Sequence, residues 1–281
     1  MLSSGSMIHE APQSDDSAVD TRATPLERSS LADLLQWMGL DGATPGTSVP
    51  IVLRRVHAGE VLFHEAKRAE AVYFIRAGTF KSTRTSEDGY EQVLGFAGRG
   101  EALGFDALCA ESHPSSAIAL EESSVYAVLV RDLLALEQRQ PEFARLVHLS
   151  MSRALTRQGE LADVMAAVAA EVRLARFLVQ WSRRSAGWGQ SPRRFYLRMS
   201  RRDIASHLGV AHETVSRSFG ALAGWGQLRV NNREIEIVDM EALKLLARST
   251  RRNGEDPILS VHRVTRPRAA ASGSSASHAT H

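Results

Sequence analysis

The strongest constraint on the fold comes from residues 200 to 224, where two helical patterns are separated by one glycine. Ser200 is placed to cap the first helix, and Gly209 supplies the left-handed backbone that would end it. Apolar residues recur at helical spacing on both sides of this turn: Ile204, Ala205 and Leu208, then Val215, Phe219 and Leu222. The small side chain of Ala205 lets a second helix cross closely. The pattern therefore predicts a helix-turn-helix.

The second helix, which opens at Ala211 or His212, keeps polar side chains on its outer face: Glu213, Thr214, Ser216 and Arg217. These residue types recognise DNA, because Arg can bond guanine O6 and N7 together, Glu can accept from cytosine N4, and a hydroxyl can reach a phosphate or a base edge. The segment LRVNNREIEIV then predicts two short strands around an Asn-Asn turn. Together these elements predict a winged helix-turn-helix.

The charge distribution agrees with a nucleic-acid partner. Residues 1–170 carry 15 basic and 23 acidic side chains, whereas residues 171–252 carry 16 basic and 7 acidic ones. A basic segment attracts a polyanion and releases its counterions on binding, while an acidic remainder stays away from it. We expect double-stranded DNA to bind the C-terminal part.

Upstream, residues 50–130 consist of short runs rich in β-branched and aromatic residues, such as AVYFIRAG and SSVYAVLV, broken every eight to twelve residues by turn residues. This spacing is typical of an antiparallel sandwich or barrel. A short helix over residues 29–39 is expected before it, capped by Ser29 or Ser30 and stopped at Gly39.

After Pro141 the pattern becomes a long helix. Residues at alternating steps of four and three form a seam: Val147, Met151, Ala154, Gln158, Leu161, Met165, Val168 and Val172. Such a stripe can pack on the chain's own barrel, but a helix of about 40 Å is longer than a barrel of this size. We therefore predict pairing with the same helix of a second copy, which makes a homodimer.

The segments DIASHLGVAHETVSR, REIEIVD, GFDAL and HPSSAIAL resemble the CRP/FNR family of bacterial regulators, and the resemblance covers residues 50–247. It implies an α+β fold with a β-roll sensor domain over residues 29–140 that resembles a cyclic-nucleotide-binding jelly roll. A dimerisation helix over 141–170 and a winged helix-turn-helix over 171–250 follow. Residues 1–28 and 251–281 are expected to be disordered tails.

The resemblance also implies roles for single residues in a transcription regulator that reads a palindromic, TTGAT-like promoter site. His212, Glu213, Ser216 and Arg217 would read bases, and His212 occupies the position among them at which family members differ. Ser200, Arg201 and Thr214 match positions that hold DNA phosphates. RNA polymerase is implied as a further partner, and the signal would be oxygen, redox state or a nitrogen oxide.

The sensor departs from the family pattern. Members that bind cyclic AMP carry a Gly-Glu pair and an Arg-Ser pair, where this chain has Gly104-Phe105 and Ser115-Ser116. Without that Arg the cyclic phosphate lacks its partner, which argues against cyclic AMP. The cysteines of the oxygen-sensing branch are absent, which argues against an iron–sulfur cluster.

Three alternatives stay open for the sensor. Cys109, the only cysteine, is a candidate redox switch, although a lone cysteine is commonly an inert small apolar residue. A haem could be ligated by one of four histidines: His57, His64, His113 and His148. The third alternative is a regulator with no effector, which the neutral Gln158 in the seam favours.

Other classes of protein find less support. No catalytic motif is present, so we do not expect an enzyme, and a single cysteine excludes a four-cysteine metal site within one chain. A signalling module whose helix-turn-helix serves protein contacts is the alternative function, against which the outward polar set and the basic charge both argue. No apolar run approaches the roughly 18 residues of a membrane span, and no secretory signal is present, so a cytoplasmic protein with no membrane partner is expected.

Overall fold

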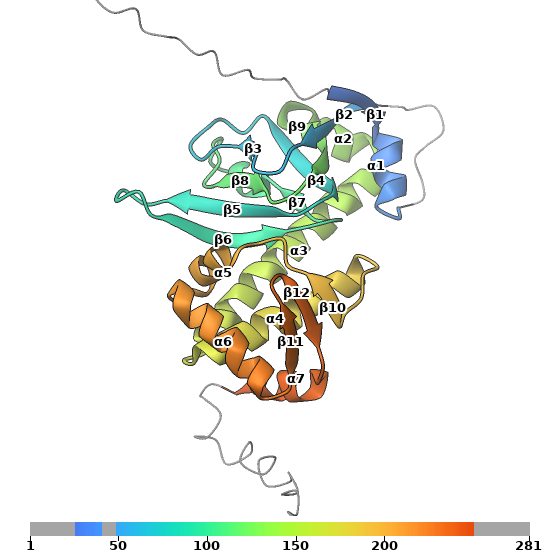
Figure 1. Cartoon of the computed structure of the whole chain (residues 1–281). Coiled ribbons are helices and arrows are strands. Elements are labelled where there is room, and N and C mark those ends of the chain that lie inside the picture. Colours follow the sequence, from blue (N-terminus) through green and yellow to red (C-terminus); the bar gives the residue numbers. More distant parts are fainter. Residues whose placement is uncertain (1–25, 41–48, 250–281) are drawn as a thin grey trace, which may run out of the picture.

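The computed structural model describes residues 26–40 and 49–249. Its N-terminal part is a β-roll of two antiparallel sheets (Figure 1). The first sheet has the order β1-β2-β9-β4-β7, with bounds Leu26–Ser30, Pro50–Val56, Ser123–Leu129, Ala71–Ala77 and Ala102–Leu103. The second has the order β3-β8-β5-β6, with bounds Val61–Phe63, Ser116–Ala119, Phe80–Thr85 and Glu91–Ala97. The short helix η1 (Phe105–Ala107) follows β7.

Apolar residues that alternate along these strands fill the space between the sheets. Ile75 and Val125 of the first sheet and Phe80 of the second are fully buried in one cluster. Each buried side chain of this size contributes about 1.5–3 kcal/mol relative to exposure. The predicted antiparallel sandwich is therefore confirmed.

The N-terminal helix and its boundary differ in part from expectation. Helix α1 (Leu31–Trp37) is capped by Ser30, whose Oγ accepts from the Asp33 amide in a capping box. The tail expected to reach residue 28 is wrong, because residues 26–30 form β1 and pair with β2. The other residues of both predicted tails, 1–25 and 250–281, lie outside the described residues.

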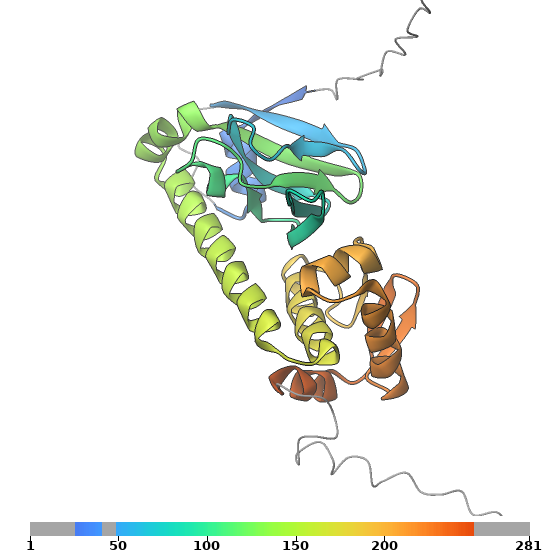
Figure 2. The same ribbon diagram turned by 90° about the vertical axis from the view of Figure 1, so that its left-hand side faces the viewer.

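Helices α2 (Val130–Arg139) and α3 (Pro141–Ala166) follow the β-roll. The first turns of α3 bury Phe143 and Leu146 in a cluster with Phe74 of the first sheet and with α1. Beyond these turns α3 continues from the β-roll to the C-terminal domain, as Figure 2 shows.

The C-terminal domain is a winged helix-turn-helix, as predicted. Its helices are α4 (Ala170–Gly187), α5 (Arg201–Leu208), α6 (His212–Gly224) and α7 (Met240–Arg248). Its sheet has the order β10-β12-β11, with bounds Arg194–Tyr196, Glu234–Ile237 and Leu228–Asn231. The two wing strands are those expected, and β10 is a third strand that the sequence did not reveal.

The dimerisation helix, predicted over residues 141–170, ends four residues early. Helix α3 ends at Ala166, and residues 167–169 connect it to α4. The break is fixed by packing: Val164 and Ala167 are buried in the C-terminal core, and Arg173 Nε donates to the Ala167 carbonyl over 2.8 Å. The same guanidinium donates through Nη1 to Leu208 at the end of α5 over 2.9 Å. The connector is therefore held against the C-terminal domain.

This break corrects the predicted seam at both ends. Val147 is 1 % exposed in the core beside the β-roll, and Val172 is fully buried within the C-terminal domain. Val168 is exposed but belongs to the connector rather than to a helix. None of the three can continue a helical seam. No helix among the described residues is both long and apolar enough to cross a bilayer.

Candidate nucleic-acid interface

Local hydrogen bonds fix the geometry of the helix-turn-helix. Ser200 Oγ accepts from the Asp203 amide over 3.0 Å, and Asp203 Oδ2 accepts from the amide and the hydroxyl of Ser200 over 2.8 and 2.6 Å. Gly209 ends α5 in the left-handed region at φ +62°. Ala205 is 3 % exposed in the shared core of the two helices. The cap at Ser200 and the turn at Gly209 are thus confirmed, and α6 is held rigidly behind α5.

The first half of α6 carries four exposed side chains that we call the reading face: His212, Glu213, Ser216 and Arg217. Ser216 Oγ donates to the His212 carbonyl over 3.3 Å, and Arg217 Nη2 donates to Thr214 Oγ1 over 3.2 Å. Ala211 at the N-cap offers no side-chain acceptor, so the amides of the first turn retain their capacity for an anion. The opposite side of α6 is buried, which directs the reading face outward.

Two of the expected phosphate ligands already have partners within the domain. The amide and hydroxyl of Ser200 are engaged by Asp203, as described above. The Arg201 guanidinium lies 3.4 Å from the centroid of the Phe219 ring and donates through Nη2 to the Asn232 carbonyl over 2.8 Å. Burial, with a smaller effect from the charge of Arg233, lowers the pKa of Arg201 to about 10, so it stays charged at neutral pH. Arg201 therefore links α5 to the wing turn.

The wing adds basic residues that the sequence reasoning missed. The wing turn is Asn232-Arg233, one residue later than the predicted Asn-Asn turn, because Asn231 still pairs with Glu234 at the end of β11. Arg233 donates through Nη1 to the Arg198 carbonyl over 3.1 Å. Arg198 in turn pairs with Glu121 of the β-roll over 2.9 Å. The signal that could have found Arg233 was its place at the tip of the predicted hairpin, beside the start of α5. Its charge lies near Arg201, which concentrates positive charge there.

Helix α3 presents an exposed apolar surface of its own. Ala154 and Leu161 of the predicted seam are half-buried and line a cavity beside the β-roll and α4, whereas Met151 and Met165 are exposed. Gln158 is exposed and also borders the cavity. The exposed residues continue through Leu155, which is 74 % exposed and was missed, and through Ala162. We call this set the α3 stripe: Met151, Leu155, Gln158, Ala162 and Met165. Its members alternate by four and three residues. It shares Met151, Gln158 and Met165 with the predicted seam, and it has Leu155 and Ala162 in place of Ala154 and Leu161.

The cavity has a volume of about 180 Å³ and lies between the β-roll interior and the helices. Its lining includes Gly104, Phe105 and Ser115 from the β-roll. Ser116 Oγ accepts from the Glu65 amide over 2.9 Å, so its hydroxyl is engaged locally. Arg157 and Arg184 also line the cavity, and both pair with Glu101, over 3.3 and 2.6 Å.

The candidate redox and haem residues lie apart in the β-roll and on α3. Cys109 is exposed, with its Sγ 3.8 Å from the Asp106 carbonyl. His57 pairs with Glu122 over 3.0 Å at the surface, and the His113 ring stacks on Phe63 at 3.8 Å between centroids. His64 and His148 are exposed. Within the described ranges, no group of three or more His, Cys, Asp or Glu side chains is arranged to hold a metal ion.

Comparison with known proteins agrees with this architecture. Residues 53–140 match the family model of the cyclic nucleotide-binding domain, and residues 172–246 match that of the Crp-like helix-turn-helix domain. The chain is 36 % identical over 192 residues to the transcriptional regulatory protein btr of Bordetella pertussis, covering 68 % of this chain and 79 % of that protein. It is 37 % identical over 196 residues to the fumarate and nitrate reduction regulatory protein of Salmonella typhimurium, covering 70 % and 78 %.

Solved structures extend the likeness to three dimensions. FixK2 from Bradyrhizobium japonicum superposes with a TM-score of 0.64 at 26 % identity, covering 72 % of this chain and 99 % of that one. A transcriptional regulator from Thermus thermophilus shares the fold with a TM-score of 0.57 at 21 % identity, covering 71 % and 100 %. The chain belongs to the CRP/FNR family of transcriptional regulators and carries its helix-turn-helix DNA-binding domain.

Proposed function

We propose that the protein acts as a homodimer that reads a palindromic, TTGAT-like promoter site with one reading face in each half-site. The observation that carries this proposal is the exposure of the four side chains of the reading face on a helix whose other side is buried in a core. These side chains are His212, Glu213, Ser216 and Arg217. Side chains held this way can enter the major groove without first being ordered.

The α3 stripe supports the dimer. Leu155 is 74 % exposed, and Met151 and Met165 are 39 % and 40 % exposed, at heptad spacing along one side of the helix. A matching stripe on a second copy would bury these side chains by knobs-into-holes packing. Two copies related by a two-fold axis would present two reading faces, which suits a palindrome.

The proposal includes contact with RNA polymerase and a form of regulation that needs no cyclic nucleotide. Ser115 and Ser116 offer hydroxyls where a cyclic phosphate would need a guanidinium. The guanidinium groups that do line the cavity, those of Arg157 and Arg184, are already paired with Glu101. We therefore expect DNA binding without an added cyclic nucleotide.

The test is a fluorescence anisotropy titration of the full chain against a palindromic TTGAT-type duplex and a scrambled duplex, with and without reductant. The wild type should prefer the palindrome in both conditions. Arg217→Ala should weaken binding to the palindrome at least about thirtyfold, because a dimer loses one forked Arg–guanine contact in each half-site and each contributes about 1–3 kcal/mol of discrimination. Arg139→Ala, which removes the same charge from the exposed end of α2, is the matched control and should bind as the wild type does.

Base substitutions sharpen the result. When the guanine of each half-site is replaced, the wild type should lose affinity. Arg217→Ala should show little further loss, because it no longer makes the contact with that guanine. If both proteins respond equally to that replacement, Arg217 does not read the guanine. A wild type that binds the scrambled duplex equally well would refute the proposed palindrome.

A further inference from the structure

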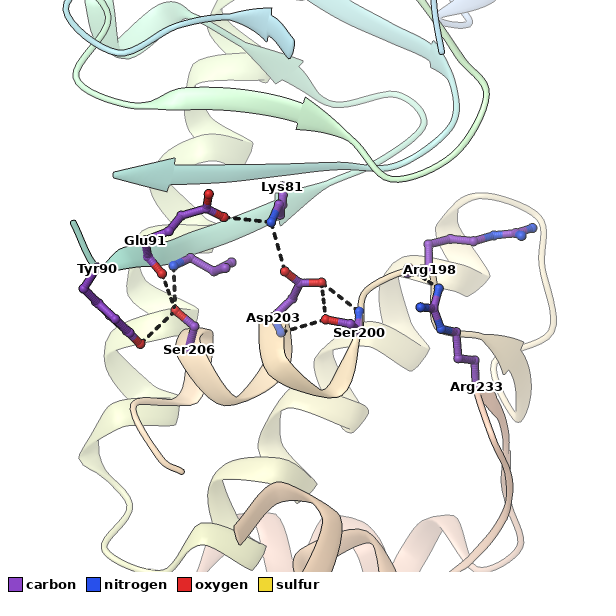
Figure 3. A network of polar contacts seen from close by, with 9 residues as sticks. Lys81, Tyr90, Glu91, Arg198, Ser200, Asp203, Ser206 and Arg233 are labelled. Carbon is purple, nitrogen blue, oxygen red and sulfur yellow. Dashed lines mark hydrogen bonds and ion pairs between the residues drawn. The ribbon is translucent and has the colours of Figure 1, made fainter. Parts of the chain in front are cut away.

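Helix α5 of the DNA-binding domain packs against β6, which is an edge strand of the β-roll. The amide of Val93 in β6 donates to Ser206 Oγ over 2.9 Å, and the Tyr90 hydroxyl lies 3.3 Å from the same oxygen (Figure 3). The Ser206 hydroxyl lies 3.3 Å from the Glu91 carbonyl, to which it donates. An edge strand exposes unpaired amides and carbonyls. One serine of α5 therefore bonds one amide and one carbonyl at the edge of the β-roll.

Lys81 connects the same two domains through ion pairs. Its Nζ lies 2.8 Å from Glu91 Oε1 and 3.0 Å from Asp203 Oδ1, and the side chains of Lys81 and Asp203 are each only 15 % exposed. Burial acts to lower the pKa of Lys81, but the hydrogen bonds with Glu91 and Asp203 outweigh it and the pKa is raised. Figure 3 shows that Asp203 uses its other oxygen to cap α5 at Ser200. Asp203 thus connects the start of α5 directly to the β-roll.

Aromatic contacts from α5, and from Trp181 and Trp188 outside it, extend the interface. The Phe96 ring of β6 makes edge contacts with Trp181 at 6.3 Å and with His207 at 5.1 Å between centroids. Trp188 packs so closely on Gly98 that a Cβ there would lie 2.5 Å from the indole ring. Contacts from β5, β6 and the following turn therefore determine how the DNA-binding domain is oriented.

The covalent link between the domains is short and is held against the DNA-binding domain by the bonds of Arg173, so the contacts of β5 and β6 act together with it to set the orientation. Residues 167–169 are the only connection along the chain between α3 and α4. A dimer on a palindrome needs its two recognition helices about 34 Å apart, so a domain that rotates about this connector would have to be ordered on binding. Contacts that hold the domain in place before DNA binds remove the cost of ordering it. They also restrict the distances between half-sites that the dimer can accept.

We propose that Lys81, although it lies in the β-roll, is a positioning residue for DNA reading: through Asp203 it holds α5, and with it α6, so that the dimer accepts one spacing between half-sites. This inference rests on the proposed function of the reading face. Lys81 itself is not proposed to touch DNA.

The experiment measures the affinity of the full chain for palindromes whose central spacer is lengthened or shortened by one and two base pairs. Lys81→Met should weaken binding at the best spacing about three- to tenfold, because the domain must then be ordered on binding. It should also reduce the preference for the best spacing over the shifted ones at least threefold. Gly98→Ala, which displaces Trp188, should act in the same direction without changing the ion pair. Lys67→Met, on the exposed β3–β4 loop, is the matched control and should change neither quantity.

Hydrogen exchange without DNA provides the second measurement. In Lys81→Met the peptide that contains Val93 should exchange faster than in the wild type, while peptides from the β-roll interior around Phe80 and Val125 should be unchanged. An unchanged Val93 peptide, or an equal loss of affinity at every spacing, would overturn the role of Lys81. A wild type that shows no preference for the palindrome would refute the proposed function instead, and the exchange result would still report on domain docking.

Discussion

His207 is a neutral histidine at the contact between the β-roll and the DNA-binding domain. Its ring lies 5.1 Å from Phe96 and 5.8 Å from Phe177. Burial lowers the pKa of His207 to about 4, the positive charge of Arg184 acts in the same direction, and a hydrogen bond with the Val93 backbone opposes both. The folded protein thus favours the neutral ring, whereas the unfolded chain takes up a proton near pH 6.5.

A pH dependence of stability follows from this difference. The contribution of His207 is fully present above pH 6.5 and is lost as the pH falls from there toward 4, by about 2 kcal/mol at pH 5. Urea unfolding at pH 7.5 and pH 5 should show that the wild type loses about 2 kcal/mol more than His207→Gln. Carboxylates such as Asp203 titrate in both proteins and cancel from the comparison. Equal losses would show that the fold does not hold His207 neutral.

For single residues, the sequence predicted which side chains face outward better than it predicted which other side chains they contact. Glu213, Ser216 and Arg217 were placed by helical period alone, and the period is a property of a single element. The contact of Arg201 with Phe219 and the wing joins three elements, so no local pattern indicates it. Lys81 and Asp203 are 122 positions apart, and their pairing appears only in the folded chain.

The element that sets the angle between α5 and α6 is the turn at Gly209. Gly209 lies at φ +62°, and an added Cβ would be 3.0 Å from Met165 Cε. Gly209→Ala should therefore lower the free energy of unfolding by about 1–2 kcal/mol, since L-residues are strained in this region. Gly220→Ala is the matched control within α6, where a Cβ meets open space. It should raise stability by about 0.5–1 kcal/mol. Chemical denaturation measures the free energy of unfolding of both variants. A similar change in both would contradict the role of the turn.

Elements with a strong local signal were predicted well, and those made by tertiary contact were not. The cap at Ser200 and the stop at Gly209 are local chemistry, and both are confirmed. The end of the dimerisation helix was predicted at residue 170, but the break at 167–169 falls in an alanine-rich run that has no Gly or Pro, where helix propensity alone would continue the helix. The burial of Ala167 and the Arg173 contact end it instead. Strand β1 is likewise defined by its pairing with β2.

At the scale of the whole molecule, the α3 stripe and the reading face belong to one proposed assembly. One face of α3 is used within the chain, because Arg153 donates to the Gly100 carbonyl over 3.2 Å and Arg157 pairs with Glu101. The opposite face carries the stripe, in which Leu155 is 74 % exposed. A second copy packed there would make Leu155 a buried contact with its own symmetry mate.

Leu155→Glu tests this assembly, because it would place two carboxylates against each other in an apolar seam. Sedimentation velocity should shift from dimer to monomer, and affinity for the palindrome should fall at least about tenfold, since each half-site then binds alone. Leu134→Glu is the matched control: Leu134 is 66 % exposed on α2, close to the 74 % of Leu155, and lies outside the stripe. It should remain a dimer and bind DNA as the wild type does. If Leu155→Glu remains a dimer, the two copies meet elsewhere, and the spacing between their reading faces would be set by another surface.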